Sequence, residues 1–141
     1  MQECVIEAIK TYPFSELERK IVNYDKSDFT FFGNKEIVVH ILFNLINNAL
    51  YFLGNHSNPQ ILIWFSSTPD NNLVHFKDNG TGISVEQFDQ IFKAFYTQSK
   101  NGTGLGLSFS KMAMTMMSGD ILCKSVKEEF TEIILKFPKY Y

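Results

Sequence analysis

One apolar segment of the sequence carries polar residues at steps of four, four and three positions: His40, Asn44, Asn48 and Tyr51. This spacing places the four side chains on one face of a helix. Asparagine is mildly unfavourable inside a helix, so two stacked asparagines suggest a function. Their carboxamide oxygens are neutral, hard ligands that could complete an octahedral magnesium site together with phosphate oxygens and water. The stripe alone fits equally well a polar face that is solvated or satisfied within the core.

A second candidate site is the turn Asp78–Ile83 (DNGTGI), which follows a predicted strand. Two glycines in a turn allow the backbone to come close to a flat ligand. An ionised Asp78 can accept a hydrogen bond from the exocyclic amine of adenine. Because Asp-Asn-Gly is also common turn chemistry, a plain turn remains the alternative.

The third candidate is the glycine-rich run 101–107 (NGTGLGL), which leads directly into a predicted helix. Backbone N–H groups at a helix N-terminus favour phosphate. A Walker loop is excluded because no Gly-Lys-Ser/Thr is present, and a dinucleotide fingerprint is excluded because Leu107 and Phe109 occupy the positions for its third glycine. A flexible linker is the alternative, but the alternation of Gly with Leu favours a phosphate-binding loop.

Periodicity and turn residues predict the elements that position these motifs. Helices are expected over 2–12, from an N-cap at Asn34 to about Leu53, briefly from Ser84, and over 105–117, with a mobile loop over 95–106. Strands are expected over 19–24, 29–32, 61–65, 72–77, 120–125 and 130–137, with a hairpin turn at 68–71. This mixture predicts a two-layer α/β sandwich in one domain.

Bulk composition narrows the function further. The chain has 141 residues, a net charge of −2 and a pI near 5.9, which argues against a nucleic-acid binder. Cys4 and Cys123 are far apart and predict free thiols rather than a zinc site. We expect no apolar run long enough to span a membrane, and the start does not resemble a signal peptide. We therefore expect a soluble, cytoplasmic domain.

Taken in order, the motifs resemble the ATP-binding catalytic domain of bacterial sensor histidine kinases, in the superfamily shared with gyrase, mismatch-repair ATPases and heat-shock chaperones. Asn44–Ala49 resembles the asparagine box, Asp78–Ile83 the first glycine box, Ile91–Thr97 the phenylalanine box and Gly102–Leu107 the second glycine box. The likeness covers about residues 28–138. It implies ATP and Mg²⁺ as cofactors and a Bergerat-type fold, in which a mixed, mostly antiparallel five-strand sheet packs on three helices. It also implies a catalytic domain over 28–141, with 1–27 as a connecting segment and first strand.

The resemblance implies a role for each matching residue. Asn44 and Asn48 would bind the metal and phosphate, and Asp78 would bind adenine. Phe92 and Phe95 would anchor one end of a lid, and Thr131 would help to hold adenine through water. The full nucleotide-binding set implied is Asn44, Asn48, Tyr51, Asp78, Gly80, Gly82, Ile83, Phe92, Phe95, Lys100, Gly102, Thr103, Gly104, Leu105, Gly106, Leu107 and Thr131.

Departures from the family pattern bear on catalysis. Gyrase-like relatives carry a Glu where this chain has Asn44, which is no useful base, so direct hydrolysis of ATP should be slow. The family usually places Lys or Arg where this chain has Tyr51, and its lid lysine is shifted by one place to Lys100. We therefore hypothesise that Lys100 supplies the missing positive charge at the γ-phosphate, and we assign catalytic roles to Asn44 and Lys100.

The resemblance implies that the phosphoacceptor is a His on a separate dimerisation domain. None of His40, His56 and His75 sits in a His-Glu/Asp setting on a dimerising helix, so each is expected to be structural. The expected partners are that domain and a downstream response regulator or receiver domain. The isolated domain is expected to be a monomer, cut from the cytoplasmic part of a membrane-bound kinase. Asn-Ala-Leu-Tyr-Phe at 48–52 and Tyr-Pro-Phe at 12–14 are similar to hybrid kinases that sense quorum signals. A non-catalytic scaffold and an anti-sigma-type Ser/Thr kinase are the alternatives.

Overall fold

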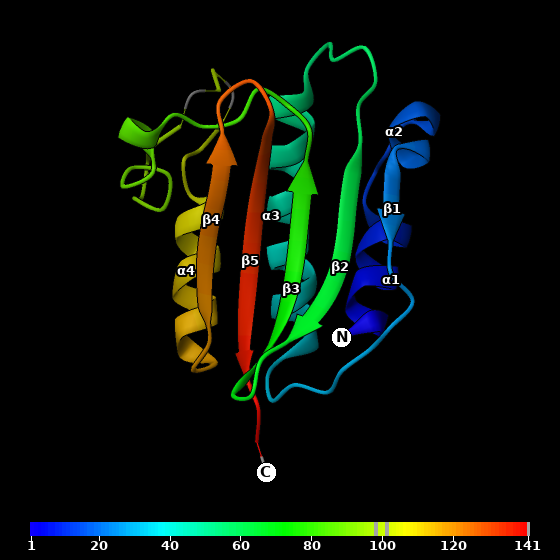
Figure 1. The fold of residues 1–141 in the computed structure, drawn as a ribbon, viewed down its shortest axis with the longest axis vertical. Coiled ribbons are helices and arrows are strands. Elements are labelled where there is room, and N and C mark those ends of the chain that lie inside the picture. Colours follow the sequence, from blue (N-terminus) through cyan, green and yellow to red (C-terminus); the bar gives the residue numbers. More distant parts are fainter. Residues whose placement is uncertain (98, 101, 141) are drawn as a thin grey trace.

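Five strands form one mixed sheet in the computed structural model, which describes residues 1–97, 99–100 and 102–140 (Figure 1). Their order across the sheet is β1-β2-β3-β5-β4. Only the pair β1–β2 is parallel among the described residues, and the other three pairs are antiparallel. The predicted mixed, mostly antiparallel sheet is therefore confirmed. The strands are β1 Val22–Tyr24, β2 Ile61–Ser67, β3 Asn71–Asp78, β4 Asp120–Val126 and β5 Phe130–Pro138.

Three helices cover one face of this sheet, as predicted: α1 Gln2–Thr11, α3 Lys35–Leu53 and α4 Gly106–Met116. In Figure 1 the longest of them, α3, runs behind the central strands with α1 and α4 on either side. Two short additional helices lie outside this layer, α2 Glu16–Lys20 beside β1 and the 3₁₀ helix η1 Val85–Gln87. The helix–sheet interface holds the hydrophobic core.

The central helix α3 is defined by its cap and its apolar face. Its N-cap is Asn34, as predicted, because the side-chain oxygen accepts a hydrogen bond from the Ile37 N–H at 3.1 Å. Gly54 follows the helix with a positive φ of 46°. Its buried residues recur at helical spacing and face the sheet and the neighbouring helices: Val38, Ile41, Leu42, Leu45, Ile46, Ala49 and Leu53.

The same helix corrects one expectation from the sequence. By length and composition, α3 is apolar enough to cross a membrane, contrary to our expectation that no segment is. Its apolar face is instead buried in the core, where Val38 and Ile41 are fully inaccessible to solvent. A central helix between a sheet and two flanking helices needs apolar residues over a wide arc, which explains why it resembles a membrane span.

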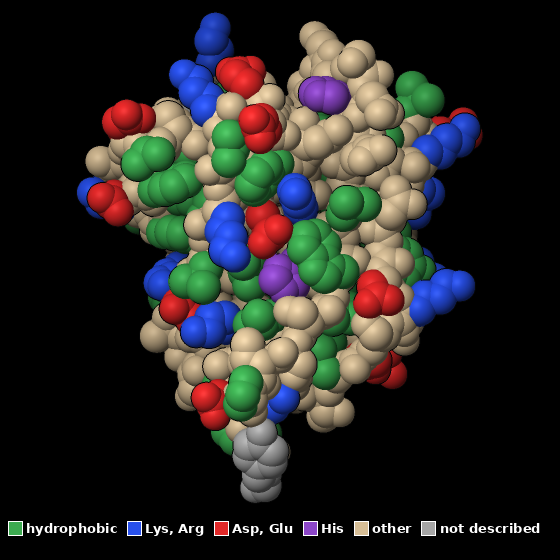
Figure 2. Space-filling model, in the orientation of Figure 1, with side chains coloured by type: hydrophobic (Ala, Val, Ile, Leu, Met, Phe, Trp, Pro, Cys, Tyr) green, Lys and Arg blue, Asp and Glu red, His purple; other side chains and the backbone are tan. Residues whose placement is uncertain are grey.

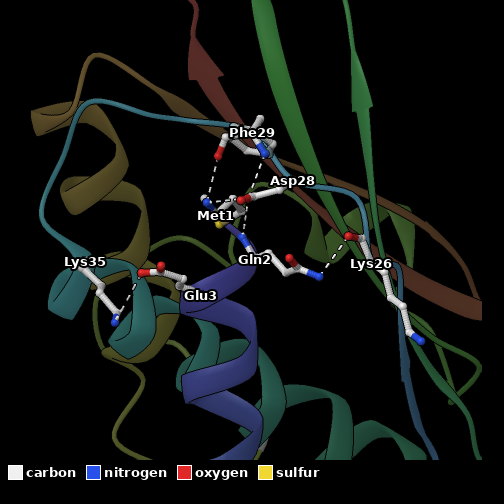
Figure 3. A network of polar contacts seen from close by, with 7 residues as sticks. All are labelled: Met1, Gln2, Glu3, Lys26, Asp28, Phe29 and Lys35. Carbon is white, nitrogen blue, oxygen red and sulfur yellow. Dashed lines mark hydrogen bonds and ion pairs between the residues drawn. The ribbon is translucent and has the colours of Figure 1, made fainter.

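The N-terminal helix α1 is held against the rest of the domain at its first turn (Figure 3). The Gln2 backbone N–H donates to Asp28 at 2.7 Å, and its side chain donates to the Lys26 carbonyl at 2.9 Å. Lys35, at the start of α3, forms ion pairs with Glu7 at 2.7 Å and with Glu3 at 3.8 Å. These contacts fix the axis of α1 beside α3.

Two predicted strands differ from the structure. The run Phe29–Phe32 was expected as a strand, but it forms none; Phe29 and Phe31 instead pack against Phe137, with ring centroids 5.8 and 5.1 Å apart. The strand expected over 19–24 is shorter, because Arg19 and Lys20 belong to α2 and only Val22–Tyr24 pairs with β2.

The second face of the sheet is seen directly in Figure 2, where hydrophobic, basic and acidic side chains are intermixed. On β3, the middle strand of the sheet, His75 stacks on Trp64 with ring centroids 4.7 Å apart. The two ring nitrogens of His75 contact Ser66 Oγ at 2.7 Å and Glu132 Oε2 at 3.3 Å. His75 is thus tied into cross-strand contacts, which fits its expected structural role.

Candidate functional site

A pocket of about 440 Å³ opens between the second half of α3, the described residues of the segment 96–104 and the start of α4. Figure 1 shows that these parts lie at the same end of the molecule as the end of β3. The wall of the pocket includes part of the predicted nucleotide-binding set: Asn44, Asn48, Tyr51, Ile83, Gly102, Thr103, Gly104, Gly106 and Leu107. Together with wall residues of the phenylalanine box, these residues show that the structure brings all four sequence motifs together around one cavity.

Asn44 connects α3 with the first turn of α4. Its Nδ2 donates to the Gly106 carbonyl at 3.1 Å and lies 3.4 Å from Ser110 Oγ. The side chain of Asn44 also packs on Gly106, where an added Cβ would stand 3.4 Å from Asn44 Cγ. With its amide nitrogen engaged in this way, Asn44 retains its oxygen as the group for a ligand, which is the atom that a magnesium ion prefers.

Asn48, one turn further along α3, carries a buried amide nitrogen that has no hydrogen-bond partner among the described residues. An unsatisfied buried donor costs free energy, so native structures rarely keep one without a reason. A phosphate oxygen would satisfy this group. A half-turn of the carboxamide would present its oxygen to a metal ion instead. Asn44 and Asn48 together therefore fit Mg-ATP, whose phosphates would supply further metal ligands; among the described residues no group of three or more His, Cys, Asp or Glu could hold a metal alone.

Asp78 is not a wall residue; it lies at the end of β3, opposite Thr131 in the register of β3 and β5. The Gly80 N–H donates to its carboxylate at 2.9 Å. Thr131 Oγ1 is 3.3 Å from Ser125 Oγ, which accepts from the Ile83 N–H at 2.7 Å. A polar row thus crosses β3, β5 and β4 and reaches the pocket wall at Ile83.

Burial changes the acidity of Asp78. Only 4% of the residue is exposed, and this desolvation raises the pKa of its carboxyl to about 7. The hydrogen bond from Gly80 works in the opposite direction but is the weaker influence. A buried carboxylate with few partners is suited to accept a hydrogen bond from a ligand amine, the role that the sequence predicts for it.

The first glycine box folds so tightly that two of its residues must lack a side chain. Gly82 has a φ of 67°, and a Cβ there would stand 2.3 Å from the Val126 carbonyl oxygen. At Gly80 a Cβ would stand 2.5 Å from the Phe52 carbonyl oxygen. These close approaches join the box to the end of α3 and to the β4–β5 turn, and they fix Ile83 at the pocket wall.

The predicted lid is closed at its base by backbone contacts. The Phe95 N–H donates to the Gly104 carbonyl at 2.8 Å, and both residues have positive φ. The ring of Phe95 is 78% exposed, so the structure gives no support to an anchoring role for that side chain. Phe92 does pack against the core, and Lys111 Nζ lies 5.9 Å from its ring centroid.

The described pocket wall is electrically neutral, since all its residues are polar without charge, apolar or glycine. Tyr51 lies in the wall, as its place on the helical stripe predicts. Lys100 is exposed and is not a wall residue. The predicted binding residues that lie outside the wall are Asp78, Gly80, Gly82, Phe92, Phe95, Lys100, Leu105 and Thr131.

Several wall residues were not predicted from the sequence. They come from the asparagine box, the end of α3, the phenylalanine box and the lid: Asn47, Phe52, Ile91, Tyr96, Thr97 and Ser99. Asn47 could have been suspected, because it lies between the two predicted ligands of the same helix. The lid residues Tyr96, Thr97 and Ser99 had no such signal in the sequence, and only the folded structure shows that they line the wall.

Comparison with known proteins decides the family. Residues 33–141 match the family described as histidine kinase-, DNA gyrase B- and HSP90-like ATPases. The chain belongs to this family. It is 36% identical over 141 residues to the CAI-1 autoinducer sensor kinase/phosphatase CqsS of Vibrio cholerae, covering 98% of this chain and 20% of the relative. It is also 33% identical over 141 residues to the autoinducer 1 sensor kinase/phosphatase LuxN of Vibrio campbellii, covering 98% and 17%.

The structural neighbours agree with these relatives. The nucleotide-free catalytic domain of the histidine kinase ThkA superposes with a TM-score of 0.81 and 25% identity, covering 99% of this chain and 92% of that domain. Family, relatives and neighbours together make the chain an ATP-binding catalytic domain of the sensor histidine kinase type. The chain spans about a fifth of the length of the curated relatives that it matches.

Proposed function

We propose that this domain transfers the γ-phosphoryl group of Mg-ATP to a histidine on a separate dimerisation domain of its parent protein. The observation that carries the proposal is the absence of any general base from the described pocket wall. Hydrolysis by activated water needs such a base. An external imidazole brings its own nucleophilic nitrogen, so it needs only a bound and oriented phosphoryl donor.

The residues of the chain would divide this work between them. Asn44 and Asn48 would hold Mg²⁺, which when bound neutralises phosphate charge. The N–H groups at the start of α4 would face the phosphates. Asp78 would accept a hydrogen bond from the adenine amine, and the segment 96–104 would exclude water above the phosphates. Lys100, which lies on this segment, would supply the further positive charge needed to stabilise the γ-phosphate.

The proposal extends to the parent protein. Residues 28–141 form the catalytic unit in it, and residues 1–27 add α1 and the first strand to the same globular fold and connect it to the His-bearing domain. A receiver domain or response regulator takes the phosphoryl group next. The place of the domain in the cell is the cytoplasm.

Lys100 supplies the test of the phosphoryl-transfer step. With a His-bearing acceptor domain, Lys100→Ala should lower the transfer rate by about tenfold or more, because a positive charge stabilises the transferring group. Binding of a non-hydrolysable ATP analogue should change by less than about threefold, since Mg²⁺ would already neutralise most of the phosphate charge in the bound ground state.

Lys93→Ala is the matched control, because Lys93 is exposed and precedes the same segment. Its transfer rate should stay at the wild-type value. A Lys100→Ala variant that transfers at the wild-type rate would show that the charge comes from elsewhere. Rapid ATP hydrolysis without any acceptor would contradict the proposed function itself.

A further inference from the structure

The residue after α1 reaches across to the pocket. Tyr12 follows the last helical residue of α1, and its hydroxyl donates a hydrogen bond to Asn47 Oδ1 on α3. Asn47 is a pocket-wall residue whose position in the sequence falls between the two predicted metal ligands, Asn44 and Asn48. A single hydrogen bond therefore connects the N-terminal helix with the wall of the nucleotide pocket.

The ring of Tyr12 is fixed independently of this hydrogen bond. It packs on Phe14 and Phe43, with ring centroids 4.5 and 5.3 Å apart, and Arg19 lies over the Phe14 ring at 5.6 Å. Edge-to-face and tilted ring pairs of this kind hold an orientation. Burial, followed by the nearby Glu18 carboxylate, raises the pKa of the Tyr12 hydroxyl, which therefore stays protonated near neutral pH. Tyr12 is thus a fixed donor at the wall.

This donor selects the orientation of the Asn47 carboxamide. When the oxygen of an amide accepts a hydrogen bond, both hydrogens of its nitrogen remain to be donated elsewhere. Asn47 is exposed at the pocket, where Asn44 has already used its own amide nitrogen on α4. The described wall has no charged residue, so a pair of neutral N–H donors on it would be available to an oxygen acceptor of high negative charge, such as a phosphate oxygen.

We propose that Asn47 is a further nucleotide-binding residue, which donates to a phosphate oxygen of the bound nucleotide, and that Tyr12 is its positioning residue. The inference rests on the proposed function of the pocket as an Mg-ATP site. It implies that nucleotide affinity depends on the packing of α1 against α3, because any shift of Tyr12 releases the amide.

Calorimetric titration of the domain with Mg²⁺ and a non-hydrolysable ATP analogue tests this proposal. Tyr12→Phe keeps the ring and removes only the hydroxyl, and Asn47→Ala removes the donor; each should weaken binding by about three- to tenfold. The double variant should bind no more weakly than Asn47→Ala, because the two residues act through one contact. Tyr24→Phe, on the exposed strand β1, is the matched control and should bind as the wild type does.

Asn47→Asp identifies the atom that Asn47 contacts. A carboxylate still accepts from Tyr12 but repels phosphate, so this variant should bind more weakly than Asn47→Ala. A ribose contact would reverse this order, because a carboxylate accepts hydrogen bonds from hydroxyls, and that result would overturn the proposal. So would unchanged affinity in Tyr12→Phe, or strictly additive losses in the double variant.

Melting temperatures separate a positioning role from a structural one. The ligand-free Tyr12→Phe domain should melt within about 2 °C of the wild type, because the ring packing is retained. A lower melting temperature with unchanged affinity would mean that the bond only stabilises the fold, which would also overturn the proposal. If the wild type binds no nucleotide at all, the proposed function fails before any variant is compared.

Discussion

Burial sets the proton affinity of Asp78, and this has a consequence for the stability of the domain. The unfolded chain releases this proton near pH 3.8, whereas the folded domain keeps it until about pH 7. Between these values the folded state binds more protons than the unfolded state, so the free energy of unfolding falls as the pH rises. The loss stops above pH 7, where both states are ionised.

Urea unfolding at pH 5 and pH 8 measures this loss. At 1.36 kcal/mol per pKa unit, the ligand-free wild type should lose on the order of 2–3 kcal/mol more than Asp78→Asn over this interval. The amide of this variant keeps the shape of the side chain and an oxygen that accepts from Gly80, but it carries no charge. Identical pH profiles for the two proteins would show that Asp78 is already ionised in the folded domain at pH 5.

At the residue scale, the sequence predicted positions of the pocket wall where a residue type and its spacing were both unusual. Asn44 and Asn48 stand out on an apolar helix, and both lie in the pocket wall. Phe52 and Ser99 could not be recognised in this way, because neither has an unusual type or spacing. They reach the wall only because α3 and the lid segment fold around the same cavity.

Among the elements, the loop after β3 depends on backbone geometry that a side chain would disrupt. Gly82→Ala combines a positive φ with a clash against the Val126 carbonyl and should lower the free energy of unfolding by about 2–4 kcal/mol. Gly54 also has a positive φ, but the nearest atom to an added Cβ is 3.8 Å away. Gly54→Ala should therefore cost less, about 1–2 kcal/mol, from the strain of its positive φ alone.

Chemical denaturation of the two alanine variants separates clash from strain. A larger loss in Gly82→Ala than in Gly54→Ala reports the contact with the β4–β5 turn, because Gly54→Ala has a positive φ without a clash. Equal losses would mean that the loop moves to accept the new methyl group. In that case the first glycine box is not the rigid support of Ile83 that its contacts indicate.

The capping of α3 is a second property of an element. Asn34→Ala removes the side-chain acceptor for the Ile37 N–H and should lower the free energy of unfolding by about 1 kcal/mol. Asn55→Ala, in the exposed loop after α3, is the control and should change stability by less than about 0.5 kcal/mol. An equal effect at both sites in urea unfolding would rule out the cap as the cause.

The predicted helices and strands were correct where a hydrophobic period extended over many residues. They were wrong where the prediction rested on a few bulky residues. The strand predicted at 29–32 followed from aromatic β-propensity, yet these rings serve as core anchors and their backbone does not join the sheet. The helix α2 was missed although Ser15 and Glu18 form a capping box, a signal that the sequence does contain. Short elements are decided by tertiary packing, which local patterns do not encode.

For the whole molecule, the order of the motifs along the chain was more informative than any one of them. Each motif alone had a plain structural alternative, but together they predicted the sheet, the three covering helices and the family, all of which are confirmed. The fold brings the ends of α3 and β3, the lid segment and the start of α4 to one end of the molecule (Figure 1). The resulting pocket has neutral walls in the part of the chain that the structure describes. To bind a polyanion such as ATP it would need a cation that is not part of those walls, such as Mg²⁺ or Lys100.

Calorimetric titration of the wild-type domain with ADP and a non-hydrolysable ATP analogue, with and without Mg²⁺, tests the central claim most directly. The account predicts a dissociation constant between about 1 μM and 1 mM, tighter binding with Mg²⁺, and loss of measurable binding in Asp78→Ala. An absence of binding by a folded wild-type domain would contradict it. The fold would then serve as a scaffold whose pocket has lost its ligand.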